Sequence, residues 1–382
     1  MLTKTGWFVL ALTAACFAVG IALNYRELVV IGACFLVCLL FAGLWLALRP
    51  RVEVKREVIP ARVSEGEGSA GVLQIRNVAH RRSPPITALE AFAGGSLTVP
   101  LPGISGGSTY TGSYLLPANR RGCFAVGPLR ISHADPLKLV NITQSYGSEA
   151  TLWVLPRIHR MSPVPTGRTQ EIEGPTTSGA PSGGIAFHSL REYVPGDDLR
   201  QIHWRSTARL DKLMVRHTVV TNEPKIMVLL DTSADPYDDE SFEDAVRIAA
   251  SLVVACADHR YPTEFRTTGG IVGSVDPTGA GRTDVLDKLA AVERSSDDQG
   301  LAAIVKMAAR REQGVSLGAV TGQPEREVAG ALGAVRGRFQ MVTLVQLGER
   351  LGRPGLSISG VLTISGNTSE DLVRIWKRRV GG

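Results

Sequence analysis

The sequence predicts a multidomain protein made of a transmembrane helical hairpin, a β-sandwich-like domain and a doubly wound α/β domain. Three observations predict it: two uncharged apolar runs at the start, short alternating stretches in the middle, and strand and helix patterns in alternation thereafter. The chain has 382 residues, which favours two to three domains of about 150 residues each. The expected parts are the hairpin at 1–50, the β-sandwich-like domain at 51–157, a flexible linker at 158–185 and the α/β domain at 186–382.

The composition excludes several classes of protein. Apolar residues make up 44% and charged residues 20%, which supplies a core and excludes a disordered chain. The net charge of +6 is small and dispersed, and aromatic residues are only 6%, so we expect no nucleic-acid partner. The five cysteines have neither the spacing of a zinc site nor that of a disulfide framework.

The first fifty residues predict a membrane anchor. The runs at 6–23 and 28–48 carry no charge, and each is about as long as a helix that crosses a bilayer. Only four residues separate them, so the two helices must be antiparallel. A signal peptide is the alternative for the first run, but no clean small-residue cleavage site precedes Asn24. Basic residues follow the second run, so we expect a multi-pass protein of the bacterial inner membrane with a cytoplasmic C-terminal part; they are Arg49, Arg51, Lys55 and Arg56.

The middle of the chain has the pattern of antiparallel β structure. Short alternating stretches are separated by Gly, Pro and Asn, which is typical of a small sandwich. The expected strands lie at 51–58, 71–77, 86–92, 109–115, 123–131 and 149–155. The segment 161–184 is dense in Pro, Gly, Ser and Thr, as in a linker.

The C-terminal part alternates strands and helices. The apolar run at 226–230 predicts a strand buried on both faces, and the stripe over 241–259 predicts an amphipathic helix. Thr368 is the expected cap of the last helix, whose basic end suits a helix C-terminus. Further strands are expected at 263–267, 271–275, 315–320, 340–346 and 357–364, and helices at 282–292, 301–311 and 324–335.

A candidate metal site follows the first of these strands. Asp231, Ser233 and Asp235 place three oxygen ligands at the carboxyl end of a strand, where open α/β sheets bind ligands. Oxygen ligands suit a hard cation such as Mg²⁺. The alternative is that Asp231 caps the turn that follows it.

The strand ending in DTSAD and the helix after it resemble a von Willebrand factor A domain with its metal-binding motif, Asp-x-Ser-x-Ser. Asp235 replaces the second serine of that motif. Thr321 stands where such a domain usually presents an aspartate, so a third ligand is missing from the pattern. Thr267, Thr268 and Thr283 are the candidates for the remaining loop ligand.

A second stretch, at 191–216, begins REYVPGDDLRQIHW. It resembles the signature of the bacterial membrane proteins grouped as domain of unknown function 58, and the resemblance extends over essentially the whole chain. It implies a membrane-tethered protein that is often encoded beside a MoxR-type AAA+ ATPase and acts in assembly or maturation of other proteins. It implies no enzymatic activity.

The signature stretch supplies the candidate partner-binding residues. Its arginines either pair with nearby carboxylates in a structural network or form a docking face. A hydrolase using Asp231 or the His203 cluster is the rival hypothesis, although no P-loop, GxSxG elbow or HExxH motif is present. We therefore expect a membrane-anchored interaction or scaffold protein and no enzyme. The candidate partner-binding residues are Arg191, Asp197, Asp198, Arg200, His203, Trp204, Arg205 and Arg209.

Overall fold

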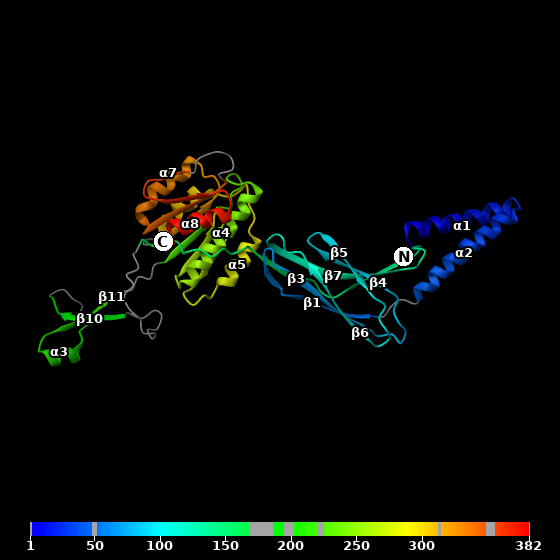
Figure 1. Cartoon of the computed structure of the whole chain (residues 1–382), viewed down its shortest axis with the longest axis horizontal. Coiled ribbons are helices and arrows are strands. Elements are labelled where there is room, and N and C mark those ends of the chain that lie inside the picture. Colours follow the sequence, from blue (N-terminus) through cyan, green and yellow to red (C-terminus); the bar gives the residue numbers. More distant parts are fainter. Residues whose placement is uncertain are drawn as a thin grey trace. The chain divides into compact units, whose positions relative to one another are not determined.

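The computed structural model divides the chain into two compact units, residues 1–158 with 286–292 and residues 159–285 with 293–382 (Figure 1). Each unit has a hydrophobic core of its own. The structure describes residues 2–47, 52–167, 186–194, 202–219, 225–311, 315–348 and 356–381.

The first unit begins with two apolar helices packed together, α1 (Lys4–Ala22) and α2 (Arg26–Ala47). Both are long and apolar enough to cross a membrane, by length and composition. Thr3 caps α1, because its hydroxyl accepts a hydrogen bond from the Gly6 amide at 3.0 Å. At the turn, a Cβ on Gly20 would lie 2.9 Å from a methyl carbon of Val29, so glycine permits the close approach of the two helices.

Two β-sheets follow. The three-stranded sheet pairs β1 (Val52–Ile59), β3 (Ser69–Asn77) and β6 (Thr109–Leu116), in that order and all antiparallel. The larger sheet has the order β2-β9-β7-β4-β5, with β8 paired to β7. Its strands are β2 (Arg62–Ser64), β4 (Ile86–Phe92), β5 (Gly95–Leu101), β7 (Gly122–Ala134), β8 (Asn141–Tyr146) and β9 (Ala150–Leu155).

The two sheets share one core and form the predicted sandwich. Leu73 and Ile75 of β3 pack in one cluster with Ala88 of β4 and with Leu129 and Ile131 of β7. The burial of β3 alternates along the strand, which is the pattern that the sequence predicts. The sequence did not predict β2, β5 and β8. β2 has only three residues and β8 buries none of its side chains, so neither carries a clear alternating pattern.

A buried polar group joins the two sheets. The guanidinium of Arg56 on β1 lies 3.0 Å from Glu90 on β4, and the hydroxyl of Tyr114 on β6 donates to Glu90 at 2.7 Å. Glu90 has no exposed surface. Burial raises the pKa of the Glu90 carboxyl, while the hydrogen bond from Tyr114 and the charge of Arg56 lower it.

The signature stretch contains a β-hairpin with a short helix. β10 (Ala186–Glu192) pairs antiparallel with β11 (Met214–Val219), and α3 (Trp204–Leu210) lies between them in the chain. Asp211 follows the helix with a positive φ of 52°, in the left-handed conformation that often ends a helix.

The C-terminal domain has a six-stranded sheet of order β14-β13-β12-β15-β16-β17. All neighbours are parallel except β14, so the predicted doubly wound sheet is confirmed with one antiparallel edge. β14 is antiparallel because a tight turn joins it to β13, and a parallel crossover needs a dozen or more residues. The strands are β12 (Ile226–Leu230), β13 (Thr263–Thr267), β14 (Val272–Val275), β15 (Ser316–Thr321), β16 (Met341–Leu347) and β17 (Leu362–Gly366).

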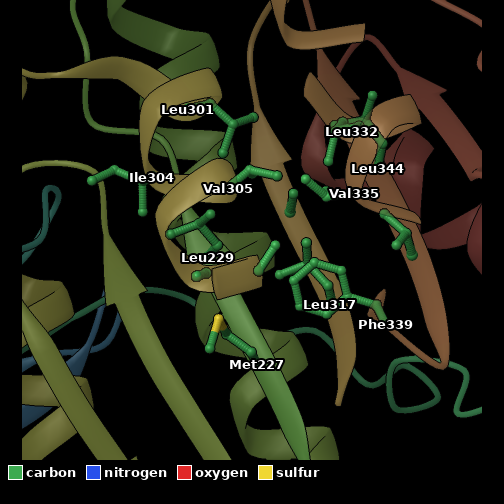
Figure 2. Packing of buried hydrophobic residues seen from close by; sticks show 14 of the residues in the cluster. Met227, Leu229, Leu301, Ile304, Val305, Leu317, Leu332, Val335, Phe339 and Leu344 are labelled. Atoms are coloured by element: carbon green, nitrogen blue, oxygen red, sulfur yellow. The ribbon is translucent and has the colours of Figure 1, made fainter. Parts of the chain in front are cut away.

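Helices cover both faces of this sheet. Figure 2 shows one face, where Val305 of α6 and Leu332 of α7 meet strand residues that include Leu229, Leu317 and Leu344. α4 packs against β12, β13, β15 and β16, and against α8. The helices of this domain are α4 (Asp239–Asp258), α6 (Gly300–Arg311), α7 (Arg326–Val335) and α8 (Ser369–Arg379), with a 3₁₀ turn η2 (Arg336–Arg338). A further helix, α5 (Arg282–Ala291), belongs in its larger part to the first unit.

The first part of the expected linker packs onto this domain. The His159 amide donates to the Ser251 hydroxyl at 2.8 Å, and the Trp376 indole donates to the Ser162 carbonyl at 2.9 Å. Val164 is buried beside Gly318 of β15. The remainder, 168–185, lies outside the described residues.

Candidate functional site

The candidate site lies where the strand order of the sheet changes direction. From β12 the chain proceeds to β13 and β14 on one side, and then to β15, β16 and β17 on the other. Asp231 directly follows β12, and its amide donates to the carbonyl of Val320 in β15 at 2.9 Å. The carboxyl ends of these two strands therefore meet at the topological switch point, where open α/β sheets bind ligands.

The Asp231 carboxylate is surrounded by hydroxyl groups. One oxygen, Oδ1, accepts hydrogen bonds from the amide and the hydroxyl of Ser233, at 3.1 and 2.6 Å. The other, Oδ2, accepts from the Thr321 hydroxyl at 2.7 Å. Only 2% of Asp231 is exposed. Thr321, at the end of β15, therefore orients this carboxylate. The resemblance to von Willebrand factor A domains predicts an aspartate at this position instead.

A second carboxylate shares this hydroxyl cluster. Asp298 Oδ2 accepts from the hydroxyls of Thr232 and Thr268, at 2.6 and 2.8 Å, and its Oδ1 accepts from the Gly300 amide at 2.9 Å. The Thr268 hydroxyl also lies 3.3 Å from Asp231 Oδ1. Thr268 thus connects the two carboxylates, and Asp298 sits at the start of α6.

Burial and charge both act on the ionisation of Asp231. Burial raises the pKa of its carboxyl, the hydrogen bonds from Ser233 and Thr321 lower it, and the negative charge of Asp298 raises it. Burial and the charge of Asp231 hold the pKa of the Tyr237 hydroxyl well above its ordinary range, and that hydroxyl donates to the Asp231 carbonyl at 2.9 Å. A cation beside Asp231 would favour its charged form.

A pocket of about 640 Å³ opens beside this cluster. This volume lies within the range of small-molecule and cofactor sites. The loops after β12 and β15 and the first turns of α6 and α7 provide most of its lining. Its acidic lining residues are Asp231, Asp235, Asp238, Asp298, Glu325 and Glu327.

The predicted metal ligands Asp231, Ser233 and Asp235 all line this pocket. Among the described residues, no group of three or more His, Cys, Asp or Glu side chains is arranged to hold a metal ion. The donors gathered around Asp231 are instead a mixed set of carboxylate and hydroxyl oxygens. Such a set fits a hard cation such as Mg²⁺, which binds one or two carboxylates and keeps several waters.

Sequence reasoning missed the role of Asp298 and Thr232 in this cluster. Thr268 was one of three candidates for the loop ligand, and the structure places it between the two carboxylates. Thr267, by contrast, accepts a hydrogen bond from the Ile271 amide in the turn before β14. Asp298 gives no signal in the sequence, because it follows Asp231 by 67 positions and stands in a loop without a motif.

The predicted partner-binding residues lie on the signature hairpin or outside the described residues. His203 caps α3, with Nδ1 2.8 Å from the Ser206 hydroxyl, while Arg205 and Arg209 lie on the helix itself. Trp204 is 68% exposed. Arg191 belongs to β10, opposite Val215 in the ladder. Asp197, Asp198 and Arg200 lie outside the residues that the structure describes.

Fold and site together define a class of protein: two packed apolar helices, a β-sandwich, and an α/β domain with an oxygen-lined pocket at its switch point. Residues 189–375 match the family described as "Protein of unknown function DUF58", so this region of the chain is similar to that family. The uncharacterized protein YeaD of Bacillus subtilis (strain 168) is a distant homologue, 28% identical over 145 residues. The match covers 37% of this chain and only 35% of that relative.

Solved structures show slight likenesses. The CARDB domain of the PF1109 protein from Pyrococcus furiosus matches 28% of this chain and 91% of its own, at 14% identity and a TM-score of 0.20. The C-terminal domain of wzt matches 29% of this chain and 78% of its own, at 10% identity and a TM-score of 0.23. Neither likeness carries an argument about function.

Proposed function

We propose that this protein is a membrane-anchored binding or scaffold protein whose α/β domain captures another protein in the pocket beside Asp231. The observation that supports this best is the position of that pocket. It lies at the switch point of the sheet, and Asp231, Ser233, Asp235 and Asp298 all line it. The Asp-x-Ser-x-Asp stretch resembles the motif of von Willebrand factor A domains, which supports a binding role for the pocket.

Mg²⁺ is the proposed ion of this site. Asp231 and Ser233 would hold it, with Asp235 and Asp298 as further oxygen donors that line the same pocket. When bound, the ion would supply a positive charge that favours the ionised form of Asp231 and an open coordination position for a partner's oxygen. Thr321 and Thr268 would orient the carboxylates, since their hydroxyls already donate to them.

The N-terminal hairpin is the proposed anchor. The helices α1 and α2 have the length and composition of membrane spans, and basic residues follow the second one. This arrangement favours the inner membrane, with the β-sandwich and the α/β domain on the cytoplasmic side. The proposed partner is a MoxR-type AAA+ ATPase, which the resemblance of the signature stretch implies, acting with this chain in assembly or maturation of other proteins.

A metal-dependent hydrolase is the second candidate. The contact of 2.8 Å between His203 Nδ1 and the Ser206 hydroxyl is the observation that favours it. The same contact belongs to a helix cap, because His203 Nδ1 also accepts from the Ser206 amide at 3.3 Å. Under this alternative, the purified chain would hydrolyse a small ester or phosphate, and His203→Ala would abolish that turnover. No turnover over a broad panel would leave it unsupported.

The binding proposal is tested with the full chain in lipid nanodiscs. Calorimetry should detect Mg²⁺ binding that Asp231→Asn abolishes and that Asp258→Asn, an exposed control in the same domain, leaves intact. Capture of a purified MoxR-type ATPase should then require both Mg²⁺ and Asp231. Capture that persists in EDTA and with Asp231→Asn would contradict the metal-centred version and direct attention to the signature hairpin.

A further inference from the structure

The described lining of the pocket beside Asp231 has more acidic than basic residues. Among the residues that the structure describes, six carboxylates line the pocket and Lys306 is the one cationic lining residue. Even a bound divalent cation would leave the negative charges in excess. A partner that offered an acidic side chain would therefore meet repulsion from most of the pocket wall.

Two of these carboxylates serve the fold. Asp238 caps α4 by accepting from the Ser241 amide at 2.7 Å, and Asp298 accepts from the Gly300 amide at the start of α6. Their charges are thus partly balanced by the positive ends of these helices. Glu327 lies 3.8 Å from Lys306.

Asp235 and Glu325 have no such role. Both are exposed, and within the described ranges neither side chain has a hydrogen bond or an ion pair. They come from different loops, after β12 and after β15, and line the same pocket. Two uncommitted carboxylates that line one pocket suit a planar guanidinium, whose donors can reach more than one acceptor.

Part of the lining is apolar. Leu301 and Val328 are buried residues at the starts of α6 and α7, and Pro236, Tyr237 and Pro324 belong to the adjoining loops. Such a surface suits the aliphatic stem of a long basic side chain, which keeps its charged end near carboxylates or water. The volume of about 640 Å³ exceeds one side chain, so a short extended segment would enter with it.

We infer that the pocket recognises an extended segment of the partner protein that carries an arginine, and that Asp235 and Glu325 bind its guanidinium. This inference rests on the proposed binding function and names the chemistry of the partner. It differs from carboxylate capture by a bound metal, because here the protein supplies the acids and the partner supplies the base.

The test uses the full chain in nanodiscs and four pools of fluorescein-labelled nonapeptides, measured by fluorescence anisotropy. The central residue is Arg, Lys, Gln or Glu, and the other positions are randomised without charged residues. The Arg pool should bind roughly three- to tenfold more tightly than the Gln pool, because its guanidinium forms exposed charge pairs that a neutral glutamine lacks. The Lys pool should be intermediate, and the Glu pool weakest.

Matched variants locate the effect. In the double variant Asp235→Asn/Glu325→Gln, the affinity for the Arg pool should fall to about the affinity for the Gln pool. The control Asp258→Asn/Glu293→Gln removes the same charge from exposed positions that do not line the pocket, and should leave the preference unchanged. Lys306→Met should strengthen Arg-pool binding, since it removes the pocket's own ammonium group.

Measurements in Mg²⁺ and in EDTA separate this inference from the metal proposal. The preference for arginine should persist in EDTA. If the chain binds no Mg²⁺ but still selects the Arg pool, the metal proposal is wrong and the arginine inference stands. Mg²⁺ binding with equal affinity for the Arg and Gln pools would overturn the arginine inference alone. Failure of every pool to bind at millimolar concentration, or equal losses in the control variant, would also overturn it.

Discussion

At the scale of single residues, Asp231 combines deep burial with a negative charge. Its hydrogen bonds from Ser233 and Thr321 orient the carboxylate, yet burial still raises the pKa of the group above its ordinary value of 3.8. Between pH 3.8 and the raised pKa, the folded state therefore holds a proton that the unfolded state releases. The stabilising effect of that proton is complete below 3.8 and is lost as pH rises through the raised pKa.

Asp231→Asn should remove this pH dependence. Without Mg²⁺, the variant should be at least as stable as the parent near neutral pH, because the amide carries no charge to desolvate. Hydrogen exchange of peptides from β12 and β15, measured from pH 4 to pH 8 and corrected for intrinsic rates, should show a smaller pH slope in the variant. A variant that exchanges much faster at every pH would show that the carboxylate is required for the fold.

Tyr114 gives a second prediction at this scale. Its hydroxyl donates to the buried Glu90, so Tyr114→Phe leaves that carboxylate one hydrogen bond short, and the β-sandwich should lose about 1–3 kcal/mol of stability. Tyr110→Phe is the matched control, because Tyr110 packs against the same core and has no recorded partner for its hydroxyl in the described part of the chain. Hydrogen exchange of β4 and β6 peptides measures both; equal effects of the two variants would contradict the prediction.

At the scale of elements, the helix starts were predictable where a local signal exists. The Thr368 hydroxyl accepts from the Asp371 amide at 3.2 Å and α8 begins at the next residue, as the sequence predicts. α4 begins at Asp239, before the predicted start at 241, with a reciprocal capping pair between Asp238 and Ser241 that the sequence analysis did not identify. These are contacts over three residues, so the sequence alone can indicate them.

Removal of the α8 cap should weaken that helix locally. Thr368→Ala should lower its stability by about 0.5–2 kcal/mol, whereas Thr368→Ser keeps the hydroxyl and should have a smaller effect. Because Trp376 is fully buried on this helix, fraying should also show in its fluorescence. Equal losses for the Ala and Ser variants would mean that the threonine methyl, rather than the cap, supports the helix.

At the scale of the whole molecule, the proposed topology places the β-sandwich on the cytoplasmic side. Cys123 is an exposed cysteine of that domain, whereas Cys256 is buried. In spheroplasts of a Gram-negative host, a membrane-impermeant maleimide should label Cys123 only after permeabilisation. Cys123→Ser should remove that signal.

A cysteine in the turn of the hairpin provides the opposite control. Tyr25 is 56% exposed in the turn between α1 and α2. Tyr25→Cys, in the Cys123→Ser background, should be labelled without permeabilisation, since the turn is proposed to face outward. The reverse labelling pattern at the two positions would invert the topology.

Local patterns determined most of the fold. Apolar run lengths predicted α1 and α2, alternation predicted the main strands of the sandwich, and the periodic stripe predicted α4. Each signal lies within one element, because burial of one face imposes a period on the residues of that element. The short strands β2 and β8 were not predicted, because they bury too few side chains to impose such a pattern.

The site itself depended on tertiary structure. The sequence by itself determined that Asp231 and Ser233 stand together at the end of a buried strand. Only the folded sheet decided that Thr321 donates to Asp231 and that Thr268 links Asp231 to Asp298, because parallel strands bring the ends of distant segments to one edge. The charge of the pocket was likewise decided by packing, since Asp235 and Glu325 are ninety positions apart in the chain and line the same pocket only in the fold.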